Sequence, residues 1–114
     1  MLRKTIAALL IATALLAIAA KSKDDDKTHK VTIKNLKYDP AKLTIKPGET
    51  VVWTNADDND HTVISDDKDG DKPLFASDNL GNGDKFTFTF EKKGKFTYHC
   101  KYHPRMKGLI TVSD

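Results

Sequence analysis

A strand pattern runs directly into a cluster of possible metal ligands in the sequence FTYHCKYHPRM, residues 96–106. Its first aromatic residues alternate with polar ones, which predicts a β-strand that ends at Cys100 with the cysteine on the core-facing side. Cys100 is the only cysteine in the chain, and His103 and Met106 follow it in steps of three. A thiolate, an imidazole and a thioether are therefore expected in one short loop.

The same alternation extends toward the N-terminus. Phe86, Phe88 and Phe90 alternate with threonines, which predicts a second strand, and Lys92 to Gly94 is typical of a hairpin turn between the two. Further strands are expected around Val31–Ile33, Leu43–Ile45, Thr50–Thr54, His61–Ile64, Leu74–Ala76 and Gly108–Val112.

Turns and loops are expected at Tyr38–Pro40, Pro47–Gly48 and Ser65–Lys72. No stretch after the leader has convincing helical periodicity. Seven to eight short strands separated by turns predict an all-β fold, a single antiparallel Greek-key sandwich or barrel.

The first twenty of the 114 residues resemble an export signal. A short basic start precedes an apolar run that ends in small residues, with cleavage expected after Ala19 or Ala20. The run is too short for a membrane anchor, which needs about 20 apolar residues. We therefore predict a signal peptide over 1–20, a flexible charged arm over 21–28 and a folded domain over 29–114, located in the periplasm without stable membrane association.

Charge and cysteine content exclude other classes. The chain has 19 basic and 16 acidic residues, and two of the basic ones lie in the leader, so the mature protein is nearly neutral. No arginine-rich stripe indicates nucleic-acid binding. A single cysteine cannot form an intramolecular disulfide, and a lone thiol in an oxidising compartment suggests a metal ligand or an intermolecular bond.

A fourth ligand must come from another segment. His99 is expected to point away from the core, because neighbouring strand residues face opposite sides. His29 lies at the edge of the first strand, whereas His61 opens a strand after a polar loop and can project from one end of a sandwich. His61 is therefore the predicted partner of Cys100 and His103.

Two histidines, one cysteine and a weak axial methionine are typical of an electron-transfer copper site. Zinc also accepts one cysteine and two histidines, but the thioether of Met106 favours copper. Thr62, next to His61, is expected to hydrogen-bond to the Cys100 loop through its hydroxyl or amide. The aspartates of Ser65–Asp71 lack the closing glutamate of a calcium loop, which favours a solvated loop.

The chain from Tyr38 onward resembles the type I blue-copper proteins, or cupredoxins, which include plastocyanin, pseudoazurin and amicyanin. The resemblance rests on Pro47-Gly48, Val52-Trp53, His61 and the segment from Gly94 to Cys100. The short spacing of Cys100, His103 and Met106 is closest to amicyanin. It implies a cupredoxin-like domain over 29–114 whose copper ligands are His61, Cys100, His103 and Met106, with electrons passing through a partly exposed His103.

The sequence departs from amicyanin around these ligands. Thr62 and Asp60 flank the first histidine, Lys101-Tyr102 separates the cysteine from the second, and Arg105 replaces an apolar residue. Basic residues around the ligand loop and aspartates before His61 are either partner-steering charges or ordinary solvated ones.

The expected function is a soluble, monomeric, exported one-electron carrier with one copper ion cycling between Cu(II) and Cu(I), and not an enzyme. Its partners would be transient redox proteins, with a donor such as a dehydrogenase and an acceptor such as a cytochrome. A copper chaperone or storage protein is the alternative, although no methionine- or histidine-rich tract favours it. A fragment of a nitrogen-oxide or oxygen reductase would need a second copper centre.

Overall fold

A computed structural model describes residues 27–114. The predicted signal peptide, 1–20, and all but the end of the predicted arm, 21–28, lie outside the described residues. Within 27–114 every regular element is a strand, and no helix is long and apolar enough to cross a membrane. The strands are β1 (Thr28–Lys34), β2 (Lys37–Asp39), β3 (Lys42–Ile45), β4 (Glu49–Asn55), β5 (Ile64–Ser65), β6 (Lys68–Asp69), β7 (Lys72–Pro73), β8 (Lys85–Phe90), β9 (Gly94–His99) and β10 (Lys107–Val112).

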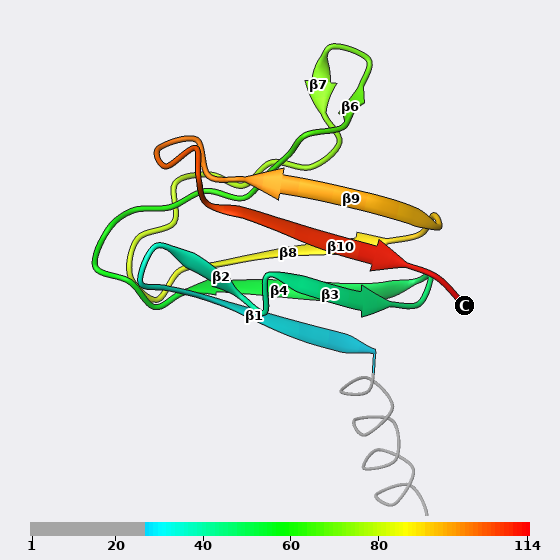
Figure 1. The fold of residues 1–114 in the computed structure, drawn as a ribbon, viewed down its shortest axis with the longest axis horizontal. Helices are drawn as coiled ribbons and strands as arrows, with labels where there is room; N and C mark the ends of the chain where they lie inside the picture. The colour runs from blue at the N-terminus through cyan, green and yellow to red at the C-terminus, as the bar shows by residue number, and fades with distance from the viewer. Residues whose placement is uncertain (1–26) are drawn as a thin grey trace, which may run out of the picture.

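Two four-stranded sheets face each other as a sandwich (Figure 1). One sheet has the order β2-β1-β4-β8 and the other has the order β3-β10-β9-β5. The short β6–β7 pair projects away from both sheets (Figure 1). The all-β prediction is confirmed, and the eight strands of the two sheets agree with the expected number.

The core forms where alternating apolar residues of both sheets meet. Val51 and Trp53 of β4 are fully buried and their strand neighbours are partly exposed. On β9 the buried Tyr98 packs edge-on against Trp53, with 5.4 Å between ring centroids. These contacts join the two sheets directly behind the end of β9, so Cys100 is positioned from a rigid base.

The predicted antiparallel order is wrong in two places. β1 pairs with β4 and β10 pairs with β3 in parallel. The turn at Lys92–Gly94 does not close a hairpin, because β8 pairs with β4 in one sheet while β9 pairs with β10 and β5 in the other. The alternation of β8 and β9 predicts strands, but it contains no information on which strands pair.

Three local predictions also differ from the structure. The expected turn at Tyr38–Pro40 begins as strand β2, which buries Tyr38 against the core. The expected loop at Ser65–Lys72 contains β6 and the start of β7. The expected strand at Leu74–Ala76 is irregular and forms one isolated bridge, between Ala76 and Ile64.

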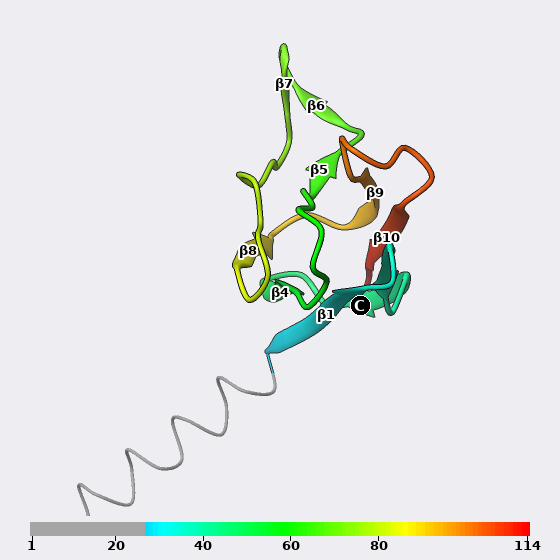
Figure 2. The ribbon, with the colours of Figure 1, turned by 90° about the vertical axis from the view of Figure 1, so that its left-hand side faces the viewer.

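Three connections meet at one end of the sandwich, at the left of Figure 1 and toward the viewer in Figure 2. They are the β1–β2 turn, the segment after β4 and the β9–β10 loop. Residues from all three take part in the site described next.

Candidate metal centre

Three ligand atoms converge at this end of the sandwich. The Sγ of Cys100 lies 3.7 Å from Nδ1 of His61 and 3.7 Å from Nδ1 of His103. The candidate ligand atoms of the three residues all lie within 4.8 Å of one another, and no other such group occurs within residues 27–114. The prediction that His61 approaches Cys100 is confirmed, although the two are 39 positions apart.

The distances fit one shared metal ion. Bonds of about 2.3 Å to sulfur and about 2.05 Å to nitrogen place these atoms about 3.8 Å apart at a trigonal angle and about 3.6 Å apart at a tetrahedral one. The observed 3.7 Å lies between the two values. The chain therefore holds the donor atoms at metal-binding separation by its own fold.

Burial and backbone pairing fix Cys100 and His61. Cys100 is fully buried at the end of β9. His61 is also fully buried, and its backbone N–H and carbonyl both bond to Leu80, at 3.0 and 2.8 Å. His61 is an isolated bridge residue, not the start of a strand as predicted, because β5 begins only at Ile64.

The short β9–β10 loop positions His103 and Met106. Met106 N–H donates to the His103 carbonyl at 2.9 Å, and Cys100 N–H donates to the Met106 carbonyl at 3.3 Å. Met106 is 4% exposed, and His103 is partly exposed. The loop thus places one imidazole toward solvent and keeps the thioether inside.

Thr62 connects the two ligand segments, as predicted. Its N–H donates to Sγ of Cys100 at 3.4 Å, and its hydroxyl accepts the Lys101 N–H at 2.9 Å. The Thr62 carbonyl accepts a 2.7 Å bond from the buried hydroxyl of Tyr38. Both the amide and the hydroxyl of Thr62 therefore hold the His61 and Cys100 segments together.

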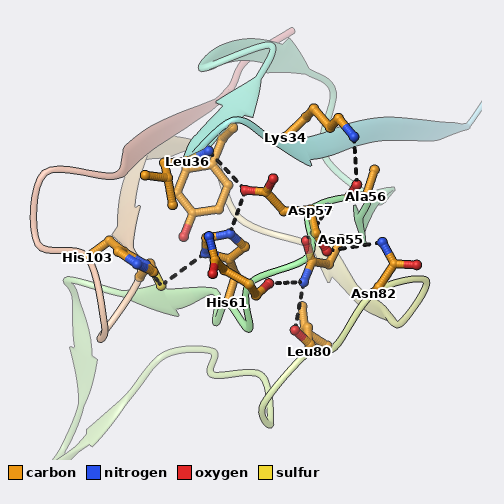
Figure 3. A network of polar contacts seen from close by, with 12 residues as sticks. Lys34, Leu36, Asn55, Ala56, Asp57, His61, Leu80, Asn82 and His103 are labelled. Atoms are coloured by element: carbon orange, nitrogen blue, oxygen red, sulfur yellow. Dashed lines mark hydrogen bonds and ion pairs between the residues drawn. The ribbon is translucent and has the colours of Figure 1, made fainter.

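Asp57 orients His61 from the opposite side of the ring. Its Oδ2 lies 2.9 Å from Nε2 of His61 and accepts the Leu36 N–H at 3.0 Å (Figure 3). The bond from the Leu36 amide, and after it the bond to His61, lowers the pKa of Asp57. An ionised carboxylate at Nε2 holds the proton on that nitrogen and leaves Nδ1 free as a ligand.

Asn55 braces the same loop. Its side chain donates to the carbonyls of Asn59 and Leu80 at 2.9 and 2.8 Å and accepts the Asp57 N–H at 2.9 Å (Figure 3). The sequence did not predict the roles of Asn55 and Asp57. The available signal is the position of Asp57, four residues before His61, but an aspartate there is equally consistent with a partner-steering or a solvated charge.

The environment of Cys100 favours the thiolate. Burial alone raises the pKa of this thiol, but bonds with His103 and His61 and with the amides of Thr62 and Tyr102 lower it overall to about 6. With a pKa of about 6, the thiol is mostly deprotonated at neutral pH. Protons therefore compete little with a metal ion for the sulfur, because the thiolate is the form that binds metal.

The remaining histidines lie away from the site. His99 points outward from β9, and its Nδ1 lies 2.6 Å from Asp66. His29 pairs with Glu49 at 2.9 Å on β1 and β4. Both outcomes agree with the prediction that neither belongs to the centre.

A buried thiol, two imidazole Nδ1 atoms 3.7 Å from its sulfur and a buried methionine in the β9–β10 loop, at one end of a β-sandwich, are the donor set of a blue-copper type of centre. The chain belongs to the cupredoxin family: residues 6–112 match the cupredoxin-like domain. The cluster of His61, Cys100 and His103, with Met106 buried in the same loop as His103, suits one copper ion.

Individual relatives agree with this assignment. Amicyanin from Paracoccus versutus is 32% identical over 82 residues, which cover 72% of this chain and 62% of the relative. Plastocyanin from Scenedesmus fuscus is 33% identical over 85 residues, with 68% and 87% covered. The solved structure of a purple cupredoxin from Nitrosopumilus maritimus is 39% identical, has a TM-score of 0.68, and covers 75% of this chain and 99% of its own. The chain thus spans less than two thirds of the amicyanin's length.

Proposed function

We propose that this chain is an exported, periplasmic one-electron carrier. Its copper ligands are His61, Cys100, His103 and Met106, and it catalyses no reaction of its own. The main support for this proposal is that Cys100 Sγ lies 3.7 Å from Nδ1 of His61 and 3.7 Å from Nδ1 of His103. When bound, copper supplies one-electron redox chemistry between Cu(II) and Cu(I).

Each ligand has a separate task. Cys100 supplies the thiolate, and the Thr62 N–H bond to its sulfur adjusts the electron density there. His61, held between Asp57 and the Leu80 backbone, keeps one position fixed. His103 is partly exposed and forms the edge through which an electron enters or leaves. Met106, buried in the same loop, would supply a weakly binding thioether.

The supports of the centre favour electron transfer over metal delivery. The thiolate is fully buried, and both flanking segments are tied together through Thr62. Ligands held by packing and hydrogen bonds keep nearly one geometry in both oxidation states, which lowers the reorganisation that accompanies electron transfer. A protein that delivers copper needs an open, easily distorted site, and these bonds oppose opening.

The partners are transient redox proteins, with a dehydrogenase as one possible donor and a cytochrome as one possible acceptor. Fast turnover requires a small interface that separates readily, at the low end of specific interface sizes. We further propose that the carrier acts as a monomer, because the ligand atoms of His61, Cys100 and His103 come together within one chain.

Voltammetry of the copper-loaded protein tests this function. We expect one reversible one-electron wave, and repeated reduction and reoxidation without loss of copper to a Cu(I) chelator. Cys100→Ser should lack the wave, and Lys92→Gln, at the other end of β9, should match the wild type. Rapid transfer of Cu(I) to the chelator, with no reversible wave, would instead support the chaperone or storage alternative.

A further inference from the structure

Strand β2 contributes one buried side chain to the protein, that of Tyr38. The Tyr38 side chain is 3% exposed and packs edge-on against Tyr98 of the opposite sheet, with 4.7 Å between the ring centroids. Its hydroxyl donates a 2.7 Å hydrogen bond to the carbonyl of Thr62. A short edge strand thus brings one phenol to the residue that follows the ligand His61.

Thr62 depends on side chains for its position, because it lies between the isolated bridge at His61 and the start of β5. Its N–H donates to Cys100 Sγ at 3.4 Å, and its carbonyl accepts the hydrogen bond from Tyr38. The sulfur and the phenol therefore hold the two backbone polar groups of one residue. A shift of the Thr62 carbonyl changes the distance from its N–H to the sulfur.

Tyr38 remains a hydrogen-bond donor although it lies near the thiolate. Burial, and after it the negative charge of Cys100, raises the pKa of Tyr38 far above its usual value. A carbonyl oxygen only accepts hydrogen bonds, so the protonated phenol is the form that binds Thr62. Removing the hydroxyl would leave a buried carbonyl without its partner, which folded proteins avoid.

We propose that Tyr38 is a positioning residue of the copper centre, whose hydroxyl sets the hydrogen bond from the Thr62 N–H to Cys100 Sγ. A donor bond to the thiolate draws electron density from sulfur and favours the reduced ion. Loss of the Tyr38 hydroxyl should therefore lengthen this bond and lower the reduction potential. The effect on the potential rests on the proposed function, whereas the hydrogen bonds themselves are present in the chain without copper.

Tyr38→Phe and Tyr98→Phe form a matched pair, because each removes one buried hydroxyl from the same aromatic contact. The Tyr98 hydroxyl lies against Gly108 and forms no hydrogen bond within residues 27–114. In voltammetry of the copper-loaded proteins, we expect Tyr38→Phe to make reduction several-fold less favourable and Tyr98→Phe to match the wild type. Equal potentials in all three proteins, or equal shifts in both variants, would overturn the proposal.

Amide hydrogen exchange in the metal-free protein supplies a readout that needs no copper. The exchange rate of the Thr62 N–H is compared with that of Ile110 in β10, which reports the stability of the whole domain. In Tyr38→Phe we expect the Thr62 rate to rise by about tenfold or more relative to the Ile110 rate, whereas Tyr98→Phe should leave the ratio unchanged. A ratio unchanged in Tyr38→Phe would show that Tyr38 only packs the core, and would overturn the proposal.

A third variant retains a donor at the same place. Replacement of Tyr38 by para-aminophenylalanine puts an amine where the hydroxyl was, and an aromatic amine donates a weaker hydrogen bond than a phenol. Its potential should therefore lie below that of the wild type and above that of Tyr38→Phe. A potential equal to the wild-type value or higher would overturn the proposal, and this comparison holds even if Tyr38→Phe does not fold.

The role of Tyr38 and the proposed function fail in different ways. Copper-loaded wild type without a reversible wave would contradict the electron-carrier function, while the exchange rate of the Thr62 N–H would still test Tyr38. A normal wild-type wave, with potential and Thr62 exchange both unaffected by Tyr38→Phe, would contradict the role of Tyr38 alone.

Discussion

Single hydrogen bonds around the ligands should set the properties of the centre. Thr62 is the clearest case at the residue scale, because its hydroxyl accepts the Lys101 N–H while its own N–H donates to Cys100 Sγ. A donor bond to a thiolate draws electron density from sulfur and favours the reduced ion.

Thr62→Ala should lower the reduction potential. Loss of the hydroxyl leaves the Lys101 N–H without its acceptor. The loop then loosens, and the hydrogen bond from the Thr62 N–H to Cys100 Sγ lengthens. We expect a decrease of tens of millivolts, less than the roughly 59 mV that corresponds to a tenfold change in the equilibrium constant for transfer of one electron. Thr62→Ser, which keeps the hydroxyl, is the matched control in voltammetry. Equal potentials in all three proteins would show that this bond does not tune the site.

Asp57→Asn should weaken metal binding. The amide cannot supply the negative charge that holds the His61 proton on Nε2, although it can still accept the Leu36 N–H. We expect copper affinity to fall by about 10–100-fold, the usual range for loss of such a supporting carboxylate. Competition titration with a chelator measures this, with the neighbouring exposed Asp58→Asn as control. An unchanged affinity would remove Asp57 from the supporting network.

At the scale of elements, the β9–β10 pair supports the ligand loop. Gly108 lies opposite Tyr98, and a Cβ built on Gly108 would stand 2.1 Å from Cζ of that buried ring. Glycine is thus required here by the close approach of a side chain.

Gly108→Ala should therefore destabilise the domain. Displacing Tyr98 disturbs its packing on Trp53 and Tyr38, and overpacking of this kind costs about 1–3 kcal/mol. Chemical denaturation of the metal-free protein measures the loss. Gly81→Ala is the control, because its nearest atom would lie at an ordinary 3.5 Å. Equal stability of the two variants would contradict this account of β9 and β10.

Elements were predicted from the sequence more reliably than their pairing. Alternation placed β4, β8, β9 and β10 within a residue or two, because each buries one face. The same pattern cannot show that β1 runs parallel to β4 or that residues 92–94 cross between sheets. β6 and β7 bury none of their residues, so they left no hydrophobic signal to detect.

The candidate site was predicted for a similar reason. Cys100, His103 and Met106 are close in sequence, so their chemistry is visible before the fold is known. His61 could be chosen from the sequence over His29 and His99 because it follows a polar loop and precedes an apolar run. The roles of Asn55 and Asp57 depend on which atoms meet across the loop, and composition alone does not contain that information.

At the scale of the whole molecule, three carboxylates link stability to pH. The pKa of Glu49 is lowered first by the Lys46 amide and then by His29, and that of Asp57 by Leu36 and His61. For Asp66, burial raises the pKa, but bonds with Thr97 and His99 outweigh it and the pKa is lowered. Each carboxylate therefore binds a proton more readily in the unfolded chain.

Stability of the metal-free protein should thus fall as the pH falls. The stabilisation is complete above the ordinary carboxyl pKa values, about 3.9 for aspartate and 4.3 for glutamate, and is lost as the pH drops through the lower native values. Denaturant midpoints measured between about pH 6 and 3 check this. Glu49→Gln should show a shallower loss than the wild type. A midpoint that rises on acidification would contradict the sign.

The central claim is that four side chains from two segments, His61 from one and Cys100, His103 and Met106 from the other, bind one copper ion, with the Cys100 thiolate among the ligands. The most direct measurement is the visible spectrum of the purified protein after one equivalent of Cu(II) is added, compared with Cys100→Ser. We predict an intense thiolate-to-copper charge-transfer band in the wild type and none in the variant. A colourless wild-type complex, or a band that survives in Cys100→Ser, would contradict the claim.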